Sequence, residues 1–411
     1  MKNQKIYRQL QEHLNKMPVG FPATKSGADI KLLMSIFTPE EAKIARFLTY
    51  KLENIEQIFD RLKQSSSTII ESHEHLAKIL DRIQKKGGIE SKIKDGVRYY
   101  CNAPLVVGIY EMQVNRLTPE FLENFNQYSS DINFALEFLS TKKPQMRTIP
   151  IQKSITPTNH VSHFDEVVKL FENAESPFVV LECICRKKRA LEEKPCKVTN
   201  RQETCIAVGE FASTALLMNI GREISRDNAI SIIEQNQKEG LVLQPSNTEK
   251  IEFICSCCGC CCGMLSIHKM LPIPVEFWSS NFYAVVDSNA CNGCGVCERR
   301  CQVGAVKIVD KSSQKIRLTR YGKEYVSPEG SAKAVVDLNV CIGCGLCVPT
   351  CSKKAVSLVK KGEETKPPLN REELYEVIMS HKQGTLGRLK TAGRLVKGMI
   401  KTGNTSLLKK P

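Results

Sequence analysis

Two cysteine runs near the C-terminal end constrain this chain more than any other feature. The first run is repeated with the same spacing 50 residues later. Three cysteines two residues apart, followed by a fourth after three more residues, is the spacing that holds paired [4Fe–4S] clusters. The fourth cysteine of each run binds the other cluster. We therefore predict one cluster on Cys291, Cys294, Cys297 and Cys351, and a second on Cys341, Cys344, Cys347 and Cys301.

The duplication extends beyond the cysteines. Ala284–Val309 aligns without gaps on Ala334–Val359, and 14 of the 26 positions are identical. The flanking valines predict short strands that keep water from the clusters. Only glycine turns the chain tightly within a ligand loop, and brings N–H groups to the sulfurs, without a Cβ penalty. The glycines predicted to contact the clusters are Gly293, Gly295, Gly343 and Gly345.

This spacing resembles that of bacterial-type ferredoxins, which implies a two-cluster domain over residues 276–361. A disulfide framework needs an oxidising compartment, and zinc sites of the C-x2-C type lack the third cysteine. The sequence differs from the usual ferredoxin pattern in two ways. Gln302 and Ser352 stand after the fourth cysteines, where the family usually has proline, and 39 residues separate Cys301 from Cys341. We predict that Lys311–Ser331 is an inserted hairpin.

Composition indicates the setting of this unit. The chain has 19 cysteines, no stretch of 18 apolar residues and no apolar signal segment at its start. These features predict a protein of a reducing cytoplasm, and the many thiols suggest an anaerobe. The formal net charge of +15 implies an acidic partner. We expect a redox protein, donor or acceptor, with an acidic docking surface; nucleic acid is a less favoured alternative.

No Gly-x-Gly-x-x-Gly motif, P-loop or nucleophile elbow is present in the sequence. The sequence thus gives no support for a flavin or nicotinamide site, and we predict no catalytic residue. We expect an electron-transfer subunit of an oxidoreductase complex, and not a self-contained enzyme.

Residues 1–140 are predicted to form a helical, winged-helix-like domain. Thr38 is placed to cap a helix that starts at Pro39, His75–Gln84 is amphipathic, and Asp95-Gly96 predicts a hairpin turn. One interpretation is DNA binding; the favoured one is a protein-docking module with a solvated charged face. The candidate DNA-contacting residues are Lys78, Arg82, Lys85, Lys86, Lys92, Lys94 and Arg98.

A linker or extended crossing at 141–160 leads to a cysteine-rich α/β domain at 161–275. Helices are expected over Ala207–Asn219 and Ser225–Lys238. Crowded thiolates repel one another, and a metal ion or cluster removes that penalty. Cys183, Cys185, Cys196 and Cys205 supply four ligands for a further [4Fe–4S] cluster; zinc, a non-cubane cluster and a redox dithiol stay open. The second cysteine run of this domain offers further candidate metal or cluster ligands, namely Cys255, Cys257, Cys258, Cys260, Cys261 and Cys262.

The tail at 362–411 is basic and amphipathic. Leu386, Leu389, Leu395, Val396, Met399 and Ile400 recur near helical spacing, and Arg388, Lys390, Arg394, Lys397 and Lys401 occupy other faces. The tail is predicted to touch a membrane surface, to dock on an acidic partner, or to pack on its own protein.

Most of the chain, from about residue 17 to 361, resembles a prokaryotic family of 4Fe–4S dicluster-domain proteins from anaerobes. The resemblance rests on Met17–Glu41, Leu105–Pro119, Cys183-Ile-Cys185-Arg186, Leu241–Asn247 and Cys255–Gly263. It implies cluster binding and carries over the eight ferredoxin cysteines. Taken together, we expect a multidomain α+β iron–sulfur protein that transfers single electrons. The alternative is an iron–sulfur redox sensor that regulates transcription through the winged-helix-like domain.

Overall fold

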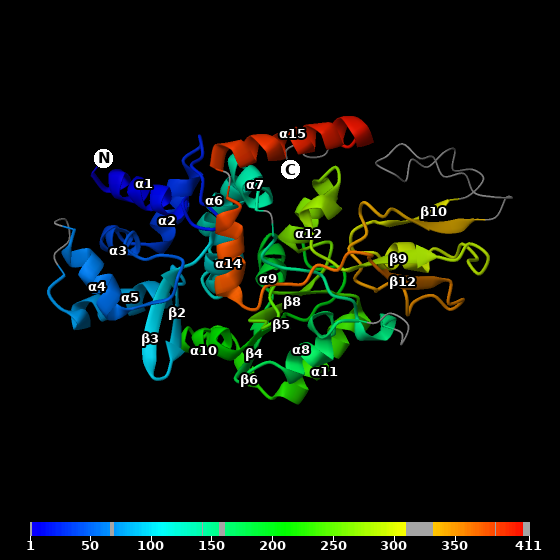
Figure 1. Cartoon of the computed structure of the whole chain (residues 1–411), viewed down its shortest axis with the longest axis horizontal. Helices are drawn as coiled ribbons and strands as arrows, with labels where there is room; N and C mark the ends of the chain where they lie inside the picture. The colour runs from blue at the N-terminus through cyan, green and yellow to red at the C-terminus, as the bar shows by residue number, and fades with distance from the viewer. Residues whose placement is uncertain are drawn as a thin grey trace.

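The computed structural model describes residues 2–65, 70–141, 143–155, 161–309, 332–382 and 384–405. The α+β chain is elongated: helices of the N-terminal region lie at one end, a five-stranded sheet occupies the middle, and the duplicated unit forms the other end (Figure 1). Within the described ranges, no helix is both long and apolar enough to cross a bilayer. The hairpin predicted at Lys311–Ser331 falls outside these ranges.

The N-terminal region combines helices with a small sheet of strand order β1-β3-β2. Thr38 caps α3 in a capping box, as predicted. Asp95 and Gly96 both have positive φ (50° and 76°) and join β2 to β3 in the predicted tight turn. The elements are α1 (Lys2–Leu14), α2 (Ala28–Ile36), α3 (Pro39–Ala45), β1 (Glu53–Asn54), α4 (Ile55–Lys63), α5 (His73–Lys85), β2 (Ile89–Lys94), β3 (Val97–Asn102), η1 (Leu105–Ile109), η2 (Glu111–Gln113), α6 (Pro119–Ser129) and α7 (Ile132–Leu139).

Several basic side chains of α5 and β3 are engaged within the protein. Arg82 Nε lies 3.0 Å and Lys86 Nζ 2.8 Å from the buried carboxylate of Glu41. Arg98 Nη1 lies 2.6 Å from Asp81 Oδ1. These ion pairs neutralise charges that a DNA-binding helix and wing would present to phosphates.

A buried group of charges ties the N-terminal region to the middle sheet and to α14 (Arg371–Ser380). Arg371 pairs with Glu90 of β2 and lies 3.7 Å from Glu252. Lys92 is only 6% exposed and pairs with Glu252 as well, so it is not free to contact DNA. Burial opposes ionisation of Glu252, but Arg371 and Lys92 outweigh it and lower its pKa to about 2.

The middle sheet is antiparallel, with strand order β6-β4-β5-β8-β7. Helix α10 starts two residues later than predicted, because Ala207 and Val208 belong to β5. Helix α11 is capped by Ser225, close to the predicted start. The elements are α8 (Val167–Glu172), β4 (Phe178–Glu182), α9 (Ile184–Leu191), β5 (Glu203–Val208), α10 (Gly209–Leu217), β6 (Arg222–Ile224), α11 (Arg226–Glu239), β7 (Val242–Pro245), β8 (Phe253–Cys257) and α12 (Gly263–Met270).

Each sheet of the duplicated unit takes one strand from each copy. Strand β9 pairs with β12, and β10 pairs with β11, both antiparallel. The first strand of one copy therefore lies beside the last strand of the other. The predicted flanking strands are present as β9 (Phe282–Val286), β10 (Val306–Val309), β11 (Lys333–Val336) and β12 (Val356–Lys360), with α13 (Val296–Arg300) after the first ligand loop.

The segment 143–155, expected as a linker or extended crossing, is largely buried and joins the middle sheet to the duplicated unit. Ile149 N–H donates to Leu243 O (3.3 Å), and Ile151 N–H donates to Cys344 O (3.1 Å). Both isoleucines belong to a hydrophobic core that also contains Ile206 of β5 and Phe282 of β9. The middle and the end of the molecule thus share one core. Short helical turns lie at η3 (Gln152–Ser154), η5 (His163–Asp165) and η6 (Pro274–Phe277).

Helix α15 (Gly384–Thr402) runs along one long edge of the molecule, beside α7 (Figure 1). The helix packs on the protein through Leu395, which is buried against Leu139 and Leu271. Arg388 pairs with the buried Glu137 of α7. Its other predicted apolar positions are largely exposed, namely Leu386, Leu389, Val396 and Ile400.

Candidate metal centres

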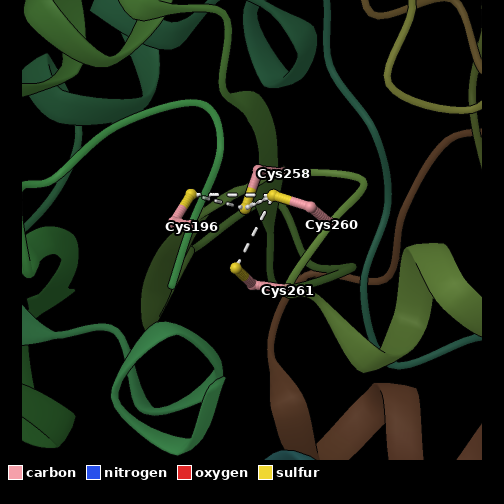
Figure 2. A group of neighbouring side chains, drawn as sticks. All are labelled: Cys196, Cys258, Cys260 and Cys261. Carbon is pink, nitrogen blue, oxygen red and sulfur yellow. Dashed lines mark hydrogen bonds between the residues drawn. The ribbon is translucent and has the colours of Figure 1, made fainter. Parts of the chain in front are cut away.

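The most compact group of ligand atoms in the described part of the chain consists of four thiols: Cys196, Cys258, Cys260 and Cys261 (Figure 2). We call it the four-thiol group. Its sulfurs all lie within 4.8 Å of one another. Cys196 comes from the loop after α9, and the other three come from the turn between β8 and α12.

The sulfur spacing in this group matches a single tetrahedral ion. Cys196 Sγ lies 3.5 Å from Cys258 Sγ and 3.7 Å from Cys260 Sγ, and Cys260 Sγ lies 3.7 Å from Cys261 Sγ. Zinc–sulfur bonds of about 2.3 Å place tetrahedral sulfur ligands about 3.8 Å apart. Four thiolates around one centre suit zinc or a single iron. A [4Fe–4S] cube holds each ligand sulfur on a separate iron, and so needs a wider set.

The other six central cysteines form a closed ring of neighbouring thiols, which we call the six-thiol ring. Each thiol interacts electrostatically with the next in the order Cys183, Cys185, Cys262, Cys257, Cys255, Cys205 and back to Cys183. The order of the cysteines around the ring therefore differs from their order along the sequence. Cys183, Cys257 and Cys262 are buried, and the other three cysteines are half-buried.

The order of the strands in the middle sheet explains why these six cysteines meet. Cys183 directly follows β4, Cys205 lies on β5, and Cys255 and Cys257 lie on β8; these three strands are neighbours. The pairing of Ile206 with Ile254 places Cys205 across from Cys255. Cys257, two residues farther along the strand, has its side chain on the same face as Cys255. The remaining members lie at helix starts, Cys185 in α9 and Cys262 at the cap of α12.

The structure does not bring the predicted ligand set of Cys183, Cys185, Cys196 and Cys205 together in one compact group. The structure places Cys196 in the four-thiol group and the other three in the six-thiol ring. The reason is that α9 carries the chain away after Cys185, so that Cys196 returns to the turn after β8 and not to β4. What the two groups bind stays a prediction.

A buried arginine, Arg186, lies close to both groups. Its side chain is only 1% exposed, and it donates to Ser256 O (3.3 Å) and to Thr204 Oγ1. Its Nε has no hydrogen-bond partner among the described residues. Burial disfavours its charge, yet the nearby Cys183 and Cys205 outweigh that effect and raise the pKa of Arg186 above its usual range. Arg186 is thus a fixed positive charge beside thiolates.

The thiols differ in their ease of ionisation. A hydrogen bond from Cys261, against the effect of burial, lowers the pKa of Cys258 to about 5. Hydrogen bonds from Cys185 and Cys205 lower the pKa of Cys183. Each central group therefore contains one thiol that ionises more readily than an ordinary cysteine, and the thiolate is the form that binds metal.

Sequence reasoning missed Glu111, which faces the six-thiol ring across a cavity. The cavity has a volume of about 90 Å³ and is lined by all six ring cysteines, by Glu111 and by apolar side chains that include Val107 and Met112. Cys258 and Cys261 of the four-thiol group also reach its wall. Burial raises the pKa of Glu111 to about 7, although Gly108 N–H donates to its Oε2 (2.8 Å). No motif marks this glutamate; it lies within the Leu105–Pro119 segment of the family resemblance.

In the duplicated unit, the structure brings cysteines of the two runs together. One cavity is lined by Cys291, Cys294 and Cys297 of the first run and by Cys351 of the second. In the reciprocal arrangement, Cys301 of the first run lies near three cysteines of the second run, as its effect on their pKa values indicates. Burial raises the pKa of Cys344 to about 12, and the nearby Cys301 adds to this effect; burial and Cys301 also raise the pKa of Cys341 and Cys347.

This geometry agrees with the comparison to protein families. Residues 290–355 match the 4Fe-4S dicluster domain. No curated protein and no solved structure matches the chain significantly. The match covers all eight cysteines of the dicluster domain and none of the central ten.

Backbone N–H groups of the dicluster domain point at its sulfurs in a two-fold pattern. Ala334 N–H lies 3.4 Å from Cys291 Sγ, and the equivalent Ala284 N–H lies 3.4 Å from Cys341 Sγ. In the same way, Ala305 and Ala355 donate to Cys301 and Cys351. Such hydrogen bonds favour the thiolate and tune cluster potential.

Gln302, where the family usually has proline, links the dicluster domain to the four-thiol group. Gly259 N–H, between Cys258 and Cys260 in the chain, donates to Gln302 Oε1 (2.8 Å). Proline at this position has no side-chain acceptor. The departure from the ferredoxin pattern thus has a structural role.

Of the four predicted loop glycines, Gly343 has the closest approach to a paired strand. Its φ is +65°, and a Cβ there would lie 2.2 Å from Phe282 O. We predict that Gly343→Ala destabilises the protein by about 3 kcal/mol or more, since backbone atoms have to shift. Gly304→Ala is the matched control: φ is +71° with no atom within 4 Å of the added Cβ, so we expect a loss of only about 1–2 kcal/mol. Equal losses in denaturant unfolding would contradict the steric argument.

Proposed function

We propose that this protein transfers single electrons through two [4Fe–4S] clusters in its dicluster domain. The observation that carries the proposal is the cavity lined by Cys291, Cys294, Cys297 and Cys351, which joins ligands of both runs as the family spacing requires. Clusters bound there supply one-electron exchange. The chain's own residues supply the thiolates, the N–H groups that stabilise them, and the strands that exclude water.

We further propose that the four-thiol group binds one metal ion, zinc or a single iron. The support is its tetrahedral sulfur spacing. The link from Gln302 to Gly259 places this group directly against the chain that follows Cys301. Arg186 offsets part of the negative charge of the thiolates.

The redox partner is proposed to dock on α15 with an acidic surface. Exposed apolar side chains (Leu389 and Val396 among them) alternate with exposed Lys390 and Lys397 on the part of the helix that does not pack on the protein. A surface of this kind suits a partner that combines carboxylates with an apolar patch. An anionic membrane surface is the alternative partner for the same face.

For the N-terminal region we propose a docking module of winged-helix-like arrangement. Helices α3, α4 and α5 followed by the β2–β3 hairpin, with β1 paired to β3, support that comparison. The regulator alternative is disfavoured by the ion pairs of Arg82, Lys86 and Arg98 and by the burial of Lys92.

Anaerobic purification of the full chain tests the electron-transfer proposal. We expect roughly eight irons and eight sulfides in the dicluster domain, and EPR signals of reduced clusters that appear with dithionite and disappear on reoxidation. Cys101→Ser is the control, because Cys101 is buried and far in the sequence from both central groups and the dicluster domain. Protein that contains zinc but no reducible cluster would overturn the proposal.

A further inference from the structure

The six-thiol ring differs from the four-thiol group in its geometry. Among the residues that the structure describes, only the four-thiol group brings three or more metal-ligating atoms within 4.8 Å of one another. No three sulfurs of the ring are therefore that close, although each has a neighbour on either side. The ring is too open to close tetrahedrally around one ion.

The number of thiols also exceeds the need of one ion. A structural zinc takes four ligands in a closed site. Six thiols inside the protein, supplied by three adjacent strands and two helix starts, suit a centre that contains several metal ions. The positive charge of such a centre removes the cost of burying several thiolates together.

The ring also opens onto space, which a purely structural site does not require. The cavity of about 90 Å³ extends from the ring thiols to apolar side chains of the N-terminal region, including Val107 and Met112. Two carboxylates line it, Glu111 and Glu182. Glu182 is paired with Lys187, whereas no cation pairs with Glu111 in the described part of the chain. The cavity has room for inorganic sulfide and for a small ligand.

Arg186 supplies the counter-charge. Its buried guanidinium interacts with Cys183 and Cys205 of the ring and with Cys258 of the four-thiol group. A buried, permanently charged arginine beside thiols is costly unless negative charge accompanies it. An anionic, thiolate-bound centre provides that charge.

From these observations we propose that Cys183, Cys185, Cys205, Cys255, Cys257 and Cys262 together bind a polynuclear iron–sulfur centre that is distinct from the four-thiol site and from the dicluster domain. Glu111 faces this centre across the cavity. The site goes beyond electron transfer through the dicluster clusters, because it adds a centre with open space and the carboxyl groups of Glu111 and Glu182 beside it.

Metal analysis of full-length variants, purified anaerobically, tests the ligand set. Apart from the single ion of the four-thiol group, we expect the unmodified chain to hold at least about two irons above the roughly eight of the dicluster domain. Cys205→Ser/Cys255→Ser should lose this excess and keep the reducible dicluster signals. Cys196→Ser/Cys260→Ser should lose one metal ion and keep the excess iron.

Three results would overturn the proposal: no excess iron in the unmodified chain, excess iron that is lost with the Cys196/Cys260 pair, or excess iron that survives the loss of Cys205 and Cys255. Retained dicluster EPR signals show that each variant is folded. They also separate this test from that of the proposed function, since either set of iron can fail alone.

A second pair of variants tests the place of Glu111. Glu111→Gln should keep the excess iron but shift the EPR or Mössbauer parameters that belong to it. Glu182→Gln, at the same cavity but paired with Lys187, is the matched control and should leave those parameters unchanged. Identical spectra for Glu111→Gln and the unmodified chain would remove Glu111 from the site.

Discussion

Replacing Cys301 with alanine is expected to remove the cluster held by Cys341, Cys344 and Cys347, and to leave the cluster nearest in sequence in place. The reason is that Cys301 lies among the thiols of the second run, while Cys351 lines the cavity of the first. The variant should lose roughly four of the eight dicluster irons. Iron and sulfide analysis with EPR of the reduced full chain measures this.

The reciprocal variant, Cys351→Ala, serves as the control. It should lose the other cluster and thus give the complementary EPR spectrum. If Cys301→Ala instead removed the cluster of Cys291, Cys294 and Cys297, the crossed assignment would be wrong.

The second large effect is expected from Arg371→Met. Methionine removes the ion-pair partner of Glu90 and leaves Glu252 paired with Lys92. Removing one partner from a buried ionic group costs about 3–5 kcal/mol of unfolding free energy. Denaturant unfolding of the anaerobic protein measures the loss.

Arg222→Met is the matched control for that variant. Arg222 forms an exposed ion pair with Glu203, so its loss should cost about 0–1 kcal/mol. Similar losses for the two variants would show that the buried charges do not stabilise the contact of α14 with β2 and the middle sheet.

Local features of this fold were predictable from sequence, because the residues that determine them are close together in the chain. The Thr38 capping box, the Asp95-Gly96 turn and the strands beside the dicluster cysteines depend on neighbours or on a repeated motif. The dicluster cysteines were recognisable for the same reason, since their spacing reflects the geometry of the cluster.

Features that depend on strand order were not predictable. Which thiols lie beside Cys196 depends on the path of the chain after α9. The six-thiol ring forms because β4, β5 and β8 are neighbours in the middle sheet. Glu111 carries no motif and becomes notable only because it faces the ring across a cavity.

The interpretation of the charge pattern stayed open for a related reason. The basic residues of α5 and β2 kept a nucleic-acid surface open as the less favoured alternative, because their acidic partners are distant in sequence. Arg82 meets Glu41, and Lys92 meets Glu252. A count of lysines and arginines along a helix does not show which charges the folded protein has already neutralised.

The core shared by Ile151, Ile206 and Phe282 affects how the protein matures and is degraded. Because this core spans the middle sheet and the dicluster domain, there is no position between them at which the chain could be cut into two stable parts. Loss of stability in the dicluster domain is therefore expected to lower the stability of the middle sheet as well. We therefore expect a chain that lacks iron in its dicluster domain to be cleaved by proteases faster along its whole length than the iron-loaded chain.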